Sequence, residues 1–142
     1  MKKILDIYKK YNEIINYLIV GALTTFVSLI VYYGCVYTFL NPNNPLQLQI
    51  ANILSWIAGV IFAYFTNRKF VFESTSKNKI KEFISFVISR ISTLLLEMFI
   101  MWFFITLLGL NSDLYVVIFT IISQIAIIVG NYVLSKLFVF KK

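Results

Sequence analysis

The sequence predicts an all-α membrane protein with four transmembrane helices. Of its 142 residues, 60% are hydrophobic and only 13% are charged. A soluble domain of this size has too much surface for its volume to bury so many apolar side chains. The apolar residues fall into four long runs, each of which exceeds the about 20 residues that a helix needs to cross hydrocarbon. These runs are 16–40, 46–67, 83–109 and 114–138.

The segments that separate these runs indicate how the helices connect. NPNNP at 41–45 and GLNSD at 109–113 have the composition of tight turns between antiparallel helices. The segment 72–82 is polar and basic. Residues 1–15 repeat apolar groups with lysines between them, which fits either an interfacial amphipathic helix or an extension of the first span.

Positively charged residues predict the orientation. Twelve of the thirteen Lys and Arg residues precede the first span, surround the middle loop or close the chain, and the remaining one is Arg90. The positive-inside rule therefore places both termini and the middle loop in the cytoplasm. Anionic membrane lipid is the expected partner of these cations, so the net charge of +7 requires no nucleic acid.

Composition also excludes several kinds of site. The chain has no His and a single cysteine, Cys35. An intrachain disulfide, a His-based metal site and His-dependent catalysis are therefore excluded. The sequence shows no pair of side chains that could act together as a catalytic acid and base. We therefore predict that the protein is not an enzyme and needs no cofactor.

The chain carries a candidate internal repeat. A shift of 68 residues aligns Phe-Val-Phe at 70–72 with the same triplet at 138–140, and it aligns Arg68 with Lys136. A shift of 69 aligns the first span with the third. A cation followed by aromatic residues also fits a helix end that is simply anchored at the headgroups.

From this alignment we predict one integral membrane domain, 1–142, built as two parallel two-helix repeats. The repeats would cover about 14–72 and 82–140. Four short helices make a thin bundle, so a homo-oligomer is also compatible with the sequence.

Polar side chains follow one face of the second span and the aligned face of the fourth. On the second span the face contains Asn52, Trp56, Gly59, Ala63 and Asn67. On the fourth it contains Thr120, Gln124, Ile127, Asn131 and Ser135. If the two polar faces meet inside the bundle, their side-chain amides can hydrogen-bond to each other. Contact between helices therefore explains any single Asn or Gln on these faces as well as ligand binding does.

The third span carries two charged residues, Arg90 and Glu97, on the face of Phe86 and Thr93. A charge at the bilayer centre costs about 3 kcal/mol on insertion scales, so such residues usually have a task. Two helical turns, about 10 Å of rise, separate the two and disfavour a direct pair. We predict a hydrated cavity where Arg90 binds an anion and Glu97 binds a sugar hydroxyl or exchanges a proton. A structural ion-pair role is the alternative.

Four segments resemble the GtrA-like family of membrane proteins. They are NYLIVGALTT in the first span, AYFTNRKFVF at 63–72, FVISR at 86–90 with Glu97 following, and NYVLSKLFVF at 131–140. The resemblance covers about residues 14–141. It implies a four-helix protein of the bacterial cytoplasmic membrane that serves glycosylation of surface polysaccharide or teichoic acid. It also implies that a polyprenyl-phosphate-linked monosaccharide is moved outward, between one membrane glycosyltransferase that makes this lipid and another that uses it.

The resemblance assigns a substrate site to seven residues of this chain: Ala63, Asn67, Val71, Phe72, Phe86, Arg90 and Asn131. The polar and cationic patterns add five more: Glu97, Arg68, Lys136, Gln124 and Asn52. Many family members have an acidic residue where this chain has Ser28 and a basic one where it has Thr120. These departures leave Arg90, Arg68 or Lys136 to hold a phosphate.

Two other functions fit the same residues. A small proton-coupled exporter would use Glu97 as its exchanging carboxylate, although Arg90 opposes a cationic cargo. A non-catalytic membrane subunit that positions a glycosyltransferase would need no transport path at all.

Overall fold

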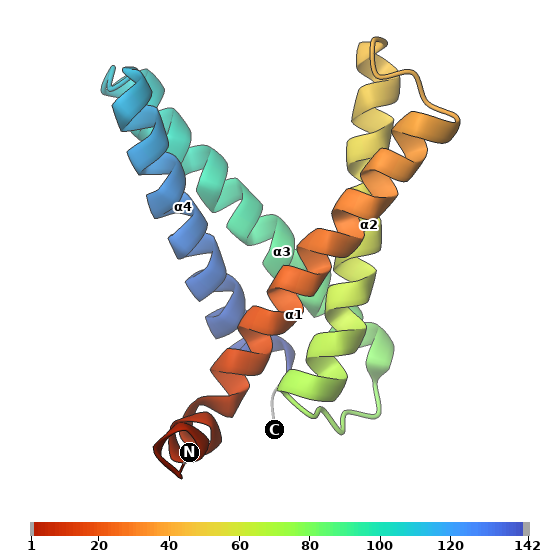
Figure 1. The fold of residues 1–142 in the computed structure, drawn as a ribbon, viewed down its shortest axis with the longest axis vertical. Coiled ribbons are helices and arrows are strands. Elements are labelled where there is room, and N and C mark those ends of the chain that lie inside the picture. The colour runs from red at the N-terminus through yellow and green to blue at the C-terminus, as the bar shows by residue number, and fades with distance from the viewer. Residues whose placement is uncertain (1, 141–142) are drawn as a thin grey trace. The chain divides into compact units, whose positions relative to one another are not determined.

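The protein is described by a computed structural model that covers the backbone of residues 2–140 and the side chains of residues 10–140 (Figure 1). The four helices are α1 (Lys2–Thr38), α2 (Pro45–Thr66), α3 (Lys79–Met101) and α4 (Asp113–Leu134). Within residues 2–140, a π-helical segment directly follows each of the last three helices: η1 (Asn67–Val71) after α2, η2 (Trp102–Leu107) after α3 and η3 (Ser135–Val139) after α4. Residues 2–140 contain no strand, and the prediction of an all-α fold is confirmed.

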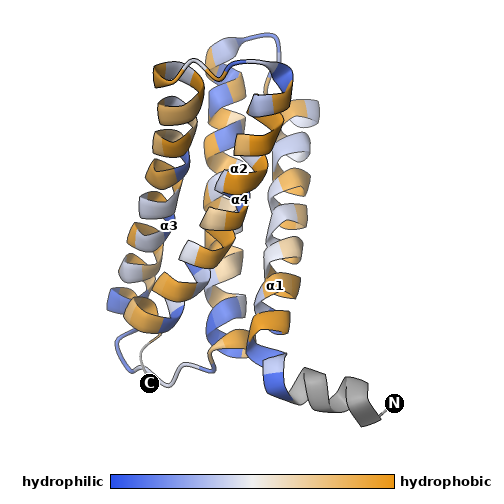
Figure 2. Cartoon of the chain, turned by 90° about the vertical axis from the view of Figure 1, so that its left-hand side faces the viewer, coloured by the Kyte–Doolittle hydropathy of each residue, from blue (hydrophilic) through white to orange (hydrophobic). Residues whose placement is uncertain are grey.

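In the described part of the chain, four helices are long and apolar enough to cross a membrane, as the sequence predicts. They run over Lys10–Thr38, Pro45–Val71, Lys79–Leu107 and Asp113–Val139. Each is 27 to 29 residues long because the π-helical segments extend the last three. At 1.5 Å of rise per residue this is about 40 Å, enough for the hydrocarbon and part of the headgroup layers. Figure 2 shows apolar residues along all four helices.

The predicted turn at 41–45 is confirmed and includes a helix cap. Asn44 Oδ1 accepts hydrogen bonds from the backbone N–H of Leu46, at 3.0 Å, and of Gln47, at 3.4 Å. Pro45 occupies the first helical position, where its missing N–H costs no hydrogen bond. Asparagine and proline thus define where α2 begins.

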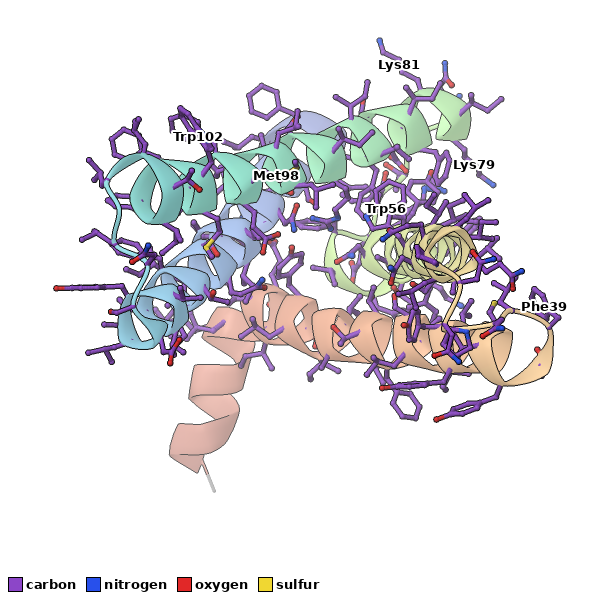
Figure 3. All side chains as sticks on the ribbon, turned by 90° about the horizontal axis from the view of Figure 1, so that it is seen from above. Phe39, Trp56, Lys79, Lys81, Met98 and Trp102 are labelled. Carbon is purple, nitrogen blue, oxygen red and sulfur yellow. The ribbon has the colours of Figure 1, made fainter. Side chains whose placement is uncertain are left out.

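The middle loop is shorter than the polar segment 72–82 suggests. Asn78 Oδ1 accepts from the backbone N–H of Lys81 at 3.1 Å, so α3 begins at Lys79. Lys79 and Lys81 therefore lie in the first turn of the helix (Figure 3). The turn at 109–113 is also confirmed, and Gly109 adopts a positive φ of 67° there.

A kink divides α1 near its start. Tyr11 has non-helical angles, φ −119° and ψ 17°, inside the helix. The Lys10 Nζ atom lies 5.4 Å from the centroid of the Tyr11 ring. The side chains of residues 1–9 lie outside the described part, so a position of this segment in the membrane interface stays a prediction.

The chain divides into two compact units, Met1–Ser74 and Thr75–Lys142. The first unit contains the α1–α2 hairpin with η1, and the second contains the α3–α4 hairpin with η2 and η3. The two predicted repeats fall one in each unit. Each unit is described below by itself.

At the η1 end of the first hairpin, α1 contacts η1 and the residue that follows it. The Asn16 Nδ2 group donates to the Phe70 carbonyl at 3.3 Å, and the rings of Tyr17 and Phe72 lie 6.4 Å apart. Further along, α1 and α2 approach closely at Gly59. A Cβ atom placed on this residue would clash with Ser28 Oγ. Small side chains thus allow α1 and α2 to pack directly.

The second hairpin ends in a similar way. Its π-helical segment η3 is offset from η1 by 68 residues. Phe140 follows η3 as Phe72 follows η1, both are 3% exposed, and Phe140 contacts Phe86 with ring centroids 5.9 Å apart. A two-helix repeat would produce these correspondences, and the repeat remains our interpretation.

Candidate functional site

Polar side chains recur along the two helices of the second unit and include pairs that join them. We call them the polar ladder: Arg90, Thr93 and Glu97 on α3, and Gln124 and Asn131 on α4. Within the ladder, side-chain hydrogen bonds join α3 to α4. Thr93 Oγ1 donates to Asn131 Oδ1 at 2.7 Å, and Gln124 Nε2 donates to Glu97 Oε1 at 2.9 Å. The structure therefore brings together four of these five residues in pairs.

The Thr93–Asn131 pair lies where the helices are close. Thr93 is only 3% exposed, and its hydroxyl also lies 3.0 Å from the Arg90 carbonyl of its own helix. A Cβ atom on Gly130 would lie 3.3 Å from Thr93 Cγ2, which is a tight contact. This pair is thus part of the packing between α3 and α4, and it also satisfies an amide that lipid would leave without a partner.

The Glu97–Gln124 pair is more open. Glu97 is half-buried and Gln124 is exposed. An ionised carboxylate only accepts hydrogen bonds, so the amide nitrogen of Gln124 must face it. Glu97 Oε2 and the Gln124 carbonyl oxygen then remain as acceptors. Within the described residues Glu97 makes no ion pair, which argues against the alternative of a structural ion pair with Arg90.

Arg90 is held against an aromatic ring. Its guanidinium carbon lies 4.3 Å from the centroid of Phe86, a cation–π contact. Phe86 is completely buried and in turn contacts Phe140. This arrangement fixes one face of the guanidinium, while its N–H donors lie in the plane of the group and can bind an anion at its edge.

Two buried polar side chains, Asn67 and Ser135, directly follow the ends of α2 and α4. Asn67 is 2% exposed, and its Nδ2 group donates to the Ala63 carbonyl at 2.7 Å. In the part of the chain that the structure describes, Asn67 Oδ1 and Ser135 Oγ are buried without a hydrogen-bond partner. Such atoms are unusual and favour a polar contact that protein atoms alone do not supply.

Other predicted site residues are placed as follows. Ala63, Val71 and Phe72 are buried, which fits a packing role, and direct contact with a substrate stays a prediction. Lys136 Nζ donates to the Tyr132 hydroxyl at 3.2 Å and is exposed. Asn52 is exposed and Arg68 is half-buried, both in the first unit.

The pairing within the ladder is what sequence reasoning missed. Glu97 and Gln124 were each predicted as site residues, but not as partners, and Thr93 was seen only as a residue of the Arg90 face. One signal for these pairs was available. In an antiparallel hairpin with its turn at 109–113, residues at similar sequence distances from the turn face each other.

Four spans and a polar ladder define a small multi-pass membrane protein. The chain matches the model of the GtrA/DPMS transmembrane domain over residues 16–140, and it belongs to this family.

The chain is also similar to individual bacterial proteins. It is 36% identical to the cell wall teichoic acid glycosylation protein GtcA of Listeria monocytogenes serovar 1/2a, over 92% of the chain and 86% of the relative. It is 37% identical to GtcA of Listeria innocua, with the same coverage. It is 31% identical to the uncharacterized membrane protein YwcD of Bacillus subtilis, over 89% of the chain and 94% of the relative. No solved structure matches it.

Proposed function

We propose that the protein translocates a polyprenyl-phosphate-linked monosaccharide across the bacterial cytoplasmic membrane, for glycosylation of a surface polysaccharide or teichoic acid. The observation that carries this proposal is the polar ladder within an otherwise apolar hairpin. The family and the printed names of the Listeria relatives support the glycosylation context.

The substrate has three parts, and the second unit offers chemistry suited to each. Arg90 supplies charged donors for the phosphate. The ladder supplies acceptors and donors for sugar hydroxyls, each of which costs about 2–7 kcal/mol to bury without a hydrogen bond. The exposed apolar side chains along α3 and η2, such as Met98 and Trp102, suit the polyprenyl tail (Figure 3).

The order of these groups along α3 suits outward movement. We propose that both termini and the middle loop are cytoplasmic. Arg90 then lies about 16 Å, and Glu97 about 27 Å, from the cytoplasmic start of α3 at Lys79, by helical rise. A headgroup that leaves the cytoplasmic leaflet would meet the cation first and the carboxylate later.

Translocation requires no bond to be made or broken. We therefore propose that the protein is not an enzyme, and that one membrane glycosyltransferase makes its lipid substrate while another consumes it outside. Glu97 has a role in binding under this proposal and need not exchange protons with a cargo.

A leaflet-accessibility assay tests the proposal. Purified protein in liposomes with a polyprenyl-phosphate hexose should expose the sugar to an external enzyme faster than empty liposomes do. Arg90→Ala should slow this exposure by about tenfold or more, since it removes a charge-assisted contact. Lys81→Ala is the matched control, because it removes a cation that lies outside the ladder in the first turn of α3.

Two results would contradict the proposal. If folded protein accelerates no exposure with any of several sugars, the protein moves no lipid, and the subunit that positions a glycosyltransferase becomes the better explanation. If transport survives Arg90→Ala at full rate, Arg90 does not hold the phosphate.

A further inference from the structure

We propose that the Glu97–Gln124 pair selects the sugar: it accepts an uncharged, hydroxyl-bearing monosaccharide and excludes an acidic one such as a uronic acid. This inference rests on the proposed function, and it adds the chemical class of the headgroup. It is based on the hydrogen bond of 2.9 Å between the two side chains and on the acceptor atoms that do not take part in this bond, the second oxygen of Glu97 and the carbonyl oxygen of Gln124.

The pair presents an excess of acceptors. The donated Gln124 N–H occupies one oxygen of Glu97, and Glu97 has no other partner among the residues that the structure describes. Its second oxygen and the carbonyl of Gln124 both accept hydrogen bonds. Sugar hydroxyls donate to such groups, whereas a carboxylate on the sugar would bring only acceptors and a second negative charge.

The pair is not needed to hold a hairpin of this kind together. At the aligned positions the first unit has Ser28 and Trp56, and there the helices pack through Ser28 against Gly59. The first hairpin therefore packs at this level without an acceptor pair. A carboxylate inside a membrane span is costly, so its presence in the second hairpin favours a ligand.

The position of the pair also fits a headgroup. Arg90 and Glu97 are two helical turns apart, about 10 Å along α3. A phosphate with one attached hexose ring can bridge this length, so a phosphate at Arg90 would place the sugar near Glu97 and Gln124. A carboxylate on that sugar would then lie close to the Glu97 carboxylate, and like charges at short range repel each other.

The experiment compares two lipids that differ only at the sugar C6 atom. A polyprenyl-phosphate hexose and the matching polyprenyl-phosphate hexuronic acid are each tested in liposomes with the full-length protein. The unchanged protein should move the hexose lipid at least about tenfold faster. Glu97→Gln should reduce this ratio to about two or less, since an amide of the same shape adds N–H donors and removes the charge.

Asp113→Asn is the matched control, because it removes one exposed carboxylate at the start of α4 and should leave the ratio unchanged. Equal movement of both lipids by the unchanged protein would overturn the inference. So would a ratio that survives Glu97→Gln, even if the hexose lipid is moved as proposed.

A binding measurement separates this inference from the proposed function. Each lipid is added to detergent-solubilised protein, and the rise in unfolding temperature is compared between the two. Preferential stabilisation by the hexose lipid that Glu97→Gln abolishes would support the inference even if no lipid crosses the membrane. Equal stabilisation by both lipids would overturn it.

Discussion

The two hairpins end in a similar way, but the contacts between their helices differ. In each, a π-helical segment leads to a buried phenylalanine that contacts an aromatic ring on the first helix of the same hairpin: Phe72 with Tyr17 on α1, and Phe140 with Phe86 on α3. Between their helices, the first unit has the close contact of Ser28 with Gly59, whereas the second has hydrogen-bonded polar pairs beside a close contact at Gly130. We interpret the common ends as structural, and our proposal assigns substrate binding to the polar pairs of the second unit.

The largest expected effect tests the shared ends. Phe72→Ala and Phe140→Ala should each destabilise the protein by about 3–5 kcal/mol, since both remove a buried ring. Unfolding by denaturant in detergent micelles measures the loss. Phe138→Ala is the control, because Phe138 is 63% exposed and should cost much less. If the two substitutions lower the free energy of unfolding by different amounts, the ends of the two hairpins are not equivalent.

The next effect tests the close packing in the first unit. Gly59→Ala should cost about 1–3 kcal/mol, because the added methyl group would clash with Ser28 Oγ. Adding Ser28→Ala should restore most of the stability, since the Ser28 Cβ atom itself is at an ordinary distance of 3.6 Å. Gly21→Ala is the control, because no atom lies within 4 Å of its added Cβ. Failure of the second substitution to rescue the first would show that this contact does not set the helix spacing.

The smallest effect sharpens the contrast between the units. Thr93→Val should cost about 1 kcal/mol, because it removes the hydrogen bond to Asn131 without changing the shape of the side chain. The aligned substitution Thr24→Val should cost less, because the Thr24 hydroxyl donates only to the Val20 carbonyl of its own helix. The same unfolding measurement compares the two, and equal losses would show that the Thr93–Asn131 bond adds nothing.

The spans and turns could be predicted because their signals are local. Twenty or more apolar residues indicate a membrane helix, and the Asn-Pro and Gly-Asn-Ser clusters mark the turns. Helix ends were less accurate. The second and fourth runs were predicted to end at 67 and 138, whereas the spans continue to Val71 and Val139 through π-helical turns. A change from α to π hydrogen bonding leaves no clear trace in hydrophobic periodicity.

The site could be predicted as residues but not as contacts. Arg90, Glu97, Gln124 and Asn131 stand out because polar groups are rare in apolar runs. Their pairing depends on the register between α3 and α4, which the turn at 109–113 and the close contact at Gly130 set together. The orientation of the chain and the repeat stay predictions.

The two bonds of the polar ladder have a consequence for motion. A side-chain hydrogen bond between membrane helices contributes about 0.6 kcal/mol on average, because the separated groups find other partners. Breaking both therefore costs about 1 kcal/mol, only a small multiple of the thermal energy. Under the proposed function, hydroxyl groups of the sugar would take the place of these bonds. The ladder is therefore a part of the α3–α4 contact whose hydrogen bonds can be exchanged at little cost, while the buried packing around Thr93 and Gly130 keeps the two helices together.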